Sequence, residues 1–191
     1  CNFVSGGQPS GAPVSIGAAL ILKPKFQVLE VLKAIRKYRP TIFPGAPSMY
    51  VAINNFRGVR RYGINSIKAC ISGSAPLPVE VQESFEKLTK GKLVDGYGLT
   101  EAAPVTHANP LGKNRRVGSI GVPLPSTHAI VVDLKTASRE VDPGQIGELA
   151  LRGPQVMMGY WKDEEATRQV LTKDGWLLTG AVAQVDEDGF F

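Results

Sequence analysis

The sequence predicts an α/β fold: a mostly parallel sheet flanked by helices, followed by a smaller β-rich subdomain. Strand-like and helix-like segments alternate through the first two thirds of the chain, which implies parallel strands covered by helices on both faces. Beyond Asn114, short apolar runs separated by turns replace the helices. Between these parts, residues 109–116 are polar and include a proline and a glycine, as is typical of a connection.

Three regions follow from this reading. We expect an irregular N-terminal segment at residues 1–17, an α/β subdomain at 18–114, and a β-rich subdomain at 115–191 that is truncated at its C-terminus. The first thirteen residues are rich in Gly, Ser and Pro and show no periodicity. The chain starts with Cys1 rather than Met, and its last four residues resemble a hairpin turn that leads into an interrupted strand. We therefore expect the chain to be an internal piece of a larger protein.

Apolar periodicity predicts the elements of the first part. Residues 28–38 place Val31, Leu32 and Ile35 on one helical face and charged residues on the other. Pro78 suits the first turn of a helix, in which Glu83 and Lys87 have the supporting i,i+4 spacing. The expected strands are 18–22, 41–43, 66–72 and 92–94, and the expected helices are 28–38, 47–55 and one that begins at residue 78.

The second part is predicted to be mainly β. Turn-forming sequences, Asp-Pro-Gly at 142–144 and Lys-Asp-Gly at 173–175, separate its apolar runs. One helix interrupts them, with Asp163 in position to cap its first turn. The expected strands are 129–133, 147–151 and 183–185.

Composition excludes several classes of protein. Apolar residues make up 43% and charged residues 20%, which is ordinary for a globular protein. The net charge of +5 is modest, and we expect it to be spread along the chain. No basic run indicates nucleic-acid binding, although the positive charge would suit anionic small molecules.

Cysteine usage and hydropathy bound the location. Cys1 and Cys70 form neither a metal-binding spacing nor a disulfide framework, which favours a reducing compartment. No segment approaches the roughly 18 apolar residues of a membrane span, and no signal peptide is present. We expect a cytoplasmic protein with at most peripheral membrane contact. His107 and His128 have no identifiable partners and are expected to be structural.

The most informative stretch follows the short apolar run at residues 92–94. Gly96 and Gly98 permit unusual backbone angles and close approach by a ligand, and Tyr97 between them offers a flat face for a planar base. Thr100 can donate a hydrogen bond to a phosphate oxygen, and Glu101 offers a hard oxygen ligand for Mg²⁺. We expect one loop to carry all three functions, which together bind a nucleotide.

This stretch resembles a known family. Asp95-Gly96-Tyr97-Gly98-Leu99-Thr100-Glu101 is similar to the central signature of the adenylate-forming enzymes, which include acyl-CoA synthetases, luciferases and the adenylation domains of peptide synthetases. Four stretches in the same order make the match specific, and it extends over nearly the whole chain from about Ala18. One further stretch, residues 71–78, lies upstream. Two lie downstream: the first comprises residues 147–149, 153–154 and 159–161, and the second comprises residues 176–180.

The resemblance implies a two-step reaction and a set of site residues. A carboxylate attacks the α-phosphate of ATP, forming an acyl-adenylate and pyrophosphate, and the thiol of CoA then displaces AMP. Thr100 would hold the α-phosphate and Glu101 the Mg²⁺, so these two are the catalytic candidates. The implied nucleotide-binding residues are Gly73, Ser74, Ala75, Pro76, Asp95, Gly96, Tyr97, Gly98, Thr100 and Ala181.

The substrate class rests on residues 18–50. Pro24-Lys25-Phe26 and the run from Phe43 to Tyr50 are most similar to long-chain fatty-acid–CoA ligases. Pro47, Ser48 and Met49 would then lie near an acyl pocket, although core packing explains them nearly as well. Two alternatives stay open: an aryl- or amino-acid-activating relative, and a non-catalytic binding module derived from the family.

Three departures from the family pattern concern activity. The family has Thr-Gly-Asp where this chain has Thr179-Gly180-Ala181, and the alanine methyl cannot accept hydrogen bonds from the ribose hydroxyls. The phosphate-binding loop that ends in a lysine is not matched upstream of Ala18. The mobile C-terminal domain, with its catalytic lysine, would begin after Phe191. We therefore expect the chain by itself to lack catalytic activity and to need the N- and C-terminal parts of the same enzyme.

Overall fold

The structure is a computed structural model that describes residues 2–5, 17–112 and 114–191. The chain divides into two compact units. Unit 1 comprises Cys1–Asp95 and Pro110–Gly118, and unit 2 comprises Gly96–Asn109 and Ser119–Phe191. The segment expected to separate two subdomains thus belongs mostly to unit 1, and the chain passes between the units more than once. Each unit is described by itself.

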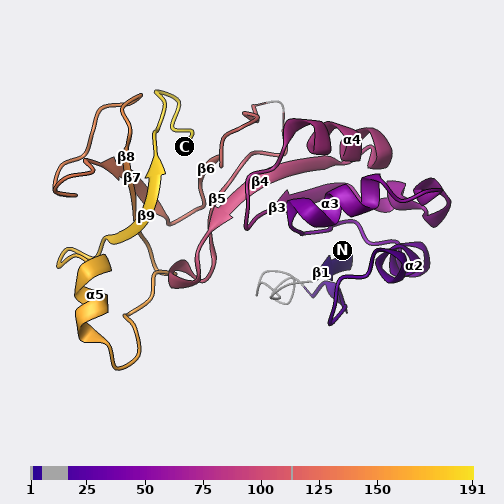
Figure 1. Ribbon diagram of the computed structural model, residues 1–191, viewed down its shortest axis with the longest axis horizontal. Coiled ribbons are helices and arrows are strands. Elements are labelled where there is room, and N and C mark those ends of the chain that lie inside the picture. Colours follow the sequence, from indigo (N-terminus) through magenta and orange to yellow (C-terminus); the bar gives the residue numbers. More distant parts are fainter. Residues whose placement is uncertain (1, 6–16, 113) are drawn as a thin grey trace. The chain divides into compact units, whose positions relative to one another are not determined.

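Unit 1 contains the alternating strands and helices that the periodicity predicts (Figure 1). A short strand at Asn2–Ser5 pairs in parallel with β2, although an irregular segment is expected there. The remainder of the Gly/Ser/Pro-rich stretch lies outside the described residues. The elements of unit 1 are β1 (Asn2–Ser5), β2 (Ala19–Leu22), α2 (Val28–Tyr38), α3 (Pro47–Asn54), η1 (Val59–Tyr62), η2 (Ile64–Ser66), β3 (Ala69–Ser72), α4 (Val79–Thr89) and the first part of β4 (Lys92–Gly98).

One expected strand of unit 1 does not form a full ladder. Residues 41–43 run beside β3 but make only isolated parallel bridges, Ile42 to Ala69 and Gly45 to Ser72. The N–H groups of Phe43 and Gly45 donate to the carbonyl oxygens of Ala69 and Ile71, both at 3.1 Å, whereas the Phe43 carbonyl oxygen accepts the Tyr50 hydroxyl at 3.0 Å. The expected strand at 66–72 is likewise shorter: Ser66 ends the 3-10 helix η2, and β3 begins only at Ala69.

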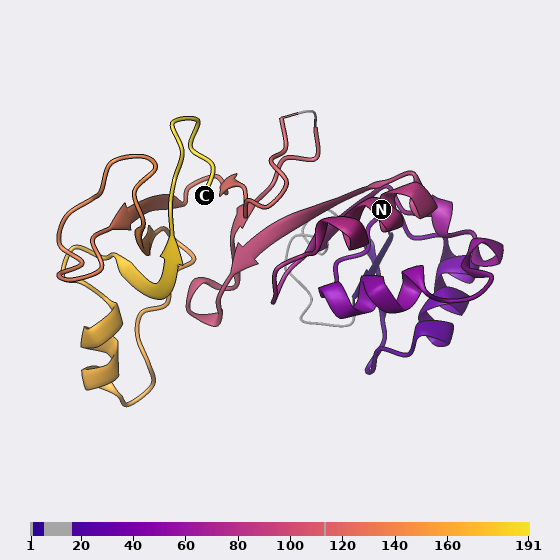
Figure 2. The same cartoon turned by 45° about the horizontal axis from the view of Figure 1, so that its top comes forward.

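Three aromatic rings form the centre of the unit 1 core. Tyr50 is fully buried and packs edge-on against Phe43 and Phe85, with ring centroids 5.8 and 4.9 Å apart. Its hydroxyl donates to the carbonyl oxygens of Phe43, at 3.0 Å, and Ile71, at 3.1 Å. The ring packing therefore joins α3 to α4, which lie side by side in Figures 1 and 2, while the hydroxyl ties α3 to the segment beside β3.

Unit 2 is β-rich, as expected, with one short helix. Asp163 caps that helix, accepting a hydrogen bond from the Ala166 N–H at 2.9 Å. The last strand differs from the expected 183–185 and begins six residues earlier, at Leu177. The elements are the end of β4, η3 (Thr100–Ala102), β5 (Val105–Ala108), β6 (Val122–Pro123), β7 (His128–Val132), β8 (Gly147–Arg152), α5 (Glu164–Val170) and β9 (Leu177–Ala183).

The sheet is mixed, so the expectation of a mostly parallel sheet was wrong. In the order β3-β4-β5-β6, β3 and β4 are parallel, whereas β4–β5 and β5–β6 are antiparallel. The reason is the short connection after β4: a parallel neighbour needs a crossover of a dozen or more residues, and η3 is far shorter. A separate antiparallel sheet has the order β7-β8-β9. The α/β class itself is confirmed.

Among the described residues, no helix is both long enough and apolar enough to span a membrane.

Candidate nucleotide-binding site

The signature at residues 95–101 is built from a strand and a 3-10 helix, and the expectation of a single loop was wrong. Gly96 and Tyr97 pair with Ala108 and His107 of β5, and the register shifts between Tyr97 and Gly98. A Cβ atom on Gly98 would lie 1.9 Å from the Pro104 carbonyl oxygen, so only glycine fits there. The chain then enters η3, which begins at Thr100. Pairing with β5, the next strand along the chain, therefore places this segment.

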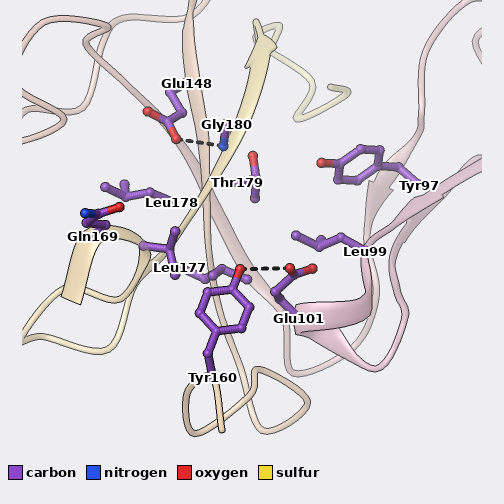
Figure 3. Close-up of a pocket in the computed structure, with 11 residues that line it drawn as sticks. Tyr97, Leu99, Glu101, Glu148, Tyr160, Gln169, Leu177, Leu178, Thr179 and Gly180 are labelled. Atoms are coloured by element: carbon purple, nitrogen blue, oxygen red, sulfur yellow. Dashed lines mark hydrogen bonds between the residues drawn. The ribbon is translucent and has the colours of Figure 1, made fainter. Parts of the chain in front are cut away.

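A pocket of about 370 Å³ lies against this segment in unit 2. Figure 3 shows Tyr97 and Glu101 on one side of it and residues of β9 on the other. Glu148 of β8, Tyr160 and the end of α5 complete the lining. The lining residues are Tyr97, Leu99, Glu101, Glu148, Tyr160, Gln169, Val170, Leu177, Leu178, Thr179 and Gly180. The lining combines apolar side chains, such as Leu99 and Leu177, with polar ones, such as Glu101 and Thr179, as is usual in small-molecule sites.

Glu101 is held in place by two hydrogen bonds. The Tyr160 hydroxyl donates to its Oε1 at 2.9 Å, and the Met157 N–H donates to its main-chain oxygen at 2.7 Å. The carboxylate raises the pKa of Tyr160, mainly through this hydrogen bond, so the hydroxyl keeps its proton. Within the described residues, Oε2 accepts no hydrogen bond. Glu101 thus keeps one oxygen with which it can bind a cation.

The magnesium assignment rests on Glu101 alone. Nowhere in the described ranges do three or more His, Cys, Asp or Glu side chains gather as a metal cluster. A single carboxylate is nevertheless sufficient for Mg²⁺, which takes one or two carboxylates together with substrate phosphates and water. The residues present therefore fit a metal that arrives with a phosphate ligand.

The opposite wall of the pocket is fixed by side chains that bond to the backbone of β8 and β9. Glu148 Oε1 accepts from the Gly180 N–H at 2.8 Å, and the Thr179 hydroxyl donates to the Leu149 carbonyl oxygen at 2.8 Å. The Ala181 N–H in turn donates to the Thr179 hydroxyl at 3.1 Å. Gly180 has a left-handed φ of +70°, which favours glycine. Ala181 follows it, half-buried, with no polar side-chain atom.

The structure does not bring all predicted site residues into this pocket. Gly96, Gly98, Thr100 and Ala181 do not line it; Thr100 is exposed at the start of η3, and Ala181 directly follows the lining residue Gly180. Asp95 and residues 73–76 belong to unit 1. Burial raises the pKa of Asp95, a hydrogen bond from the Leu77 backbone opposes this, and the net shift is upward. In the loop after β3, Ser74 has a left-handed φ of +71°, and Ser74, Ala75 and Pro76 are exposed. The roles given to these residues stay predictions.

Several lining residues were not predicted. Glu148 and Tyr160 lie in stretches noted for the family resemblance, but no role was assigned to them. Glu148 follows Gly147 and Tyr160 follows Gly159 in these stretches, and this position was a signal from which a role in the site could have been predicted. Gln169, at the end of α5, gave no such signal, because the sequence of a helix does not show which other segments its polar face contacts in the folded protein.

His107 packs against Tyr97. It is fully buried, its ring lies edge-on to Tyr97 with centroids 6.2 Å apart, and Phe191 packs on it at 4.8 Å. Its Nδ1 is 3.0 Å from the Thr106 hydroxyl, while Nε2 has no partner in the part of the chain that the structure describes. Burial lowers the pKa of His107 to about 4, so the ring is neutral at pH 7. His107 is thus a core residue, whereas His128 is exposed at the start of β7.

Known proteins resemble this chain in sequence and in fold. A long-chain-fatty-acid–CoA ligase of Bacillus subtilis is 51% identical over 178 residues, which is 93% of this chain and 31% of that protein. MatB of Rhodopseudomonas palustris, solved with ATP bound, matches 99% of the chain and 39% of its own with a TM-score of 0.86 at 27% identity. The anthranilate CoA ligase AuaEII, solved with anthranoyl-AMP, matches 99% and 38% with a TM-score of 0.87 at 29% identity.

The matches cover most of this chain but only part of each relative. The chain spans about a third of the length of the curated relatives that it matches. The model of a family described as AMP-binding enzyme matches residues 9–161, which include the signature segment, Glu148 and Tyr160. This chain therefore belongs to the AMP-binding enzyme family.

Proposed function

We propose that the chain forms the nucleotide-binding centre of a long-chain fatty-acid–CoA ligase. In the proposed reaction, a fatty-acid carboxylate oxygen attacks the α-phosphorus of ATP and pyrophosphate leaves. The CoA thiolate then attacks the acyl carbon of the adenylate, and AMP leaves. Positioning and charge neutralisation supply most of the catalysis in such a reaction. The proposed partners are accordingly ATP with Mg²⁺, a fatty acid and CoA.

One observation carries the proposal. The pocket in unit 2 gathers Tyr97 and Glu101 of the signature with Thr179 and Gly180 of the last motif, although some eighty residues separate them in the sequence. The chemistry of its walls suits adenosine: an aromatic face for the base, and polar backbone and side-chain groups for the sugar. Glu101 would hold the Mg²⁺, and Thr100 would contact the α-phosphate.

The substrate class follows from the more similar relatives. Relatives named long-chain-fatty-acid–CoA ligases reach 51% identity over 93% of this chain. This similarity favours a fatty acid as the substrate. Mass spectrometry of the products that the full-length enzyme forms from mixed fatty and aryl acids would test this assignment.

A second proposal concerns the chain by itself. Ala181 removes the carboxylate that would accept hydrogen bonds from both ribose hydroxyls. Hydroxyls left without partners in a half-buried site cost on the order of 1–3 kcal/mol, roughly five- to a hundredfold in affinity. We infer that the chain binds nucleotide weakly and does not turn over substrate. Conversion of palmitate to its adenylate by these 191 residues would contradict this inference.

Calorimetric titration with ATP–Mg²⁺ and with AMP tests the site directly. We expect Ala181→Asp to tighten binding of both nucleotides at least about tenfold, because the carboxylate supplies the missing acceptor. The matched control is Val182→Asp, which places the same charge on the neighbouring, 68% exposed residue of β9 and should leave affinity unchanged. No binding by any of the three forms would show that the chain has no adenosine site.

A further inference from the structure

The charge of the protein is divided between the two units, so the expectation of an even spread was wrong. Unit 1 contains 16 Lys and Arg and 5 Asp and Glu, a net charge of +11. Unit 2 contains 6 Lys and Arg and 12 Asp and Glu, a net charge of −6. The overall +5 conceals this contrast, because the opposite net charges of the two units partly cancel. A strongly basic unit attracts anions over several ångströms.

Part of this charge surrounds a hollow in unit 1. A pocket of about 330 Å³ lies between the 3-10 helices and the end of α4. Arg60 of η1 and Lys87 and Lys90 at the end of α4 are its exposed basic residues. Asn65 adds an amide, while Ile64, which is 1% exposed, and the half-buried Leu88 supply apolar surface. No Asp or Glu lines the pocket among the described residues.

The cations of this pocket are poorly neutralised. Lys87 is 3.5 Å from Glu83, but both side chains are more than 60% exposed. Arg60 and Lys90 have no acidic partner within the described ranges of the chain. By contrast, Arg115 of the same unit makes a two-point contact with Glu86. A cation near a helix C-terminus complements the helix dipole, which explains Lys87 and the C-cap residue Lys90. It does not explain why Arg60, on another element, joins them around one partly apolar hollow.

We propose that this pocket binds a phosphate group. Arg60 would form paired hydrogen bonds to two phosphate oxygens, and the two lysine ammonium groups would supply point charges. Ile64 and Leu88 would contact the carbon atoms attached to the phosphate. The phosphate could belong to a lipid headgroup or to a soluble phosphate compound, because the same contacts recognise either. The site lies wholly in unit 1, apart from the unit 2 pocket, and does not depend on the proposed ligase function.

The test uses a triple variant of the whole chain, Arg60→Gln with Lys87→Gln and Lys90→Gln. Its matched control, Lys23→Gln with Lys25→Gln and Lys33→Gln, removes the same charge from unit 1 at residues that do not line the pocket. The probes are inorganic phosphate, followed by NMR shifts of the Asn65 and Lys87–Lys90 amides, and phosphatidylcholine vesicles with and without phosphatidylglycerol, followed by sedimentation. Circular dichroism confirms that each variant is folded.

We expect the affinity of the triple variant for the anionic vesicles to fall about a hundredfold, because each basic residue near an anionic surface contributes roughly fivefold. The phosphate-induced NMR shifts should also be lost. The control should lose much less. Binding of phosphate without vesicle binding would identify a soluble ligand, and vesicle binding that depends on the pocket residues would identify a headgroup. Equal losses in both triple variants, or no response to either probe in the wild-type chain, would overturn the proposal.

Discussion

The two units differ in the residues that form their cores as well as in net charge. Unit 1 is basic, and three interlocked aromatic rings, Phe43, Tyr50 and Phe85, fill its centre. Unit 2 is acidic, and its main cluster consists of smaller aliphatic residues, Ala102, Leu149, Leu151 and Leu177, with Tyr97 and Leu99 packed on its margin. Both units hold a pocket, of about 330 Å³ in unit 1 and about 370 Å³ in unit 2, but exposed cations line the first, whereas Leu177 of the aliphatic cluster lines the second together with Tyr97 and Leu99. The comparison indicates that the units suit different ligands: unit 2 holds the proposed nucleotide pocket and unit 1 the basic pocket.

The largest expected effect comes from removing a ring of unit 1. Phe85→Ala should lower the free energy of unfolding of unit 1 by about 3–5 kcal/mol, because the ring is 1% exposed and packs on Tyr50. Leu151→Ala, in the unit 2 cluster, should cost about 2–5 kcal/mol, towards the lower end because neighbours at the pocket margin can relax. Hydrogen exchange resolved by residue would assign each loss to its unit.

Val79→Ala on the same helix as Phe85 is the control, since Val79 is 45% exposed and should change stability little. An equal loss of protection in both units after Phe85→Ala would break the comparison, because it would show that they unfold as one.

Acid should destabilise the two units over different pH ranges. In unit 2, burial lowers the pKa of His107 from 6.5 to about 4. The unfolded chain takes up this proton near pH 6.5 but the folded chain does not, so stability is complete above pH 6.5 and falls as the pH drops towards 4. The total loss is on the order of 3 kcal/mol. Urea unfolding from pH 7.5 to 4, monitored at unit 2 amides, measures it.

His107→Phe should remove this slope whatever its effect on stability at pH 7. His128→Phe is the matched control at an exposed histidine of the same unit and should preserve the slope. A slope that survives His107→Phe would assign the acid sensitivity to other groups.

The smallest expected effect concerns residues 110–118, which return the chain to unit 1. Arg115 contacts both carboxylate oxygens of Glu86, whose side chain is 16% exposed, and Glu86 also accepts the Leu93 N–H at 2.9 Å. Arg115→Ala should destabilise unit 1 by about 1–3 kcal/mol, because it leaves a half-buried carboxylate without its main partner. Exchange protection in unit 2 should not change. Lys33→Ala, which breaks an exposed ion pair on α2, should have no resolvable effect.

The same pair gives unit 1 its own acid range. Burial raises the pKa of Glu86, but hydrogen bonds from Arg115 and Leu93 and the charges of Arg115 and Lys92 outweigh it, so the net pKa lies below the usual 4.5. The stability that Glu86 contributes is therefore complete above pH 4.5 and is lost as the pH falls through the lowered pKa. Arg115→Ala should flatten the dependence in this range. An unchanged dependence below pH 4.5 would contradict the role given to the pair.

The proposed site was predictable to the extent that its chemistry is local. Tyr97 and Glu101 were identified from their neighbours in the signature, and the structure places both in the unit 2 pocket. Tyr160, whose hydroxyl orients Glu101, is 59 residues further along the chain, and no pattern of spacing connects the two. The partnership of Glu148 with the Gly180 N–H likewise depends on the pairing of β8 with β9.

The sequence by itself determined the elements whose stability is local. The helices α2 and α4 follow from one apolar stripe and from Pro78, and the Asp163 cap from one side chain, because hydrogen bonds within a helix join near neighbours. Tertiary structure decided the rest. The strand through Gly96 and Gly98, the mixed sheet and the start of β9 at Leu177 all depend on which strands pair with each other, and the pattern within one segment does not show its partner. The division of charge, by contrast, is already present in the sequence, as an excess of basic residues before residue 119 and of acidic residues after it; the structure adds that residues 110–118 belong to the basic unit.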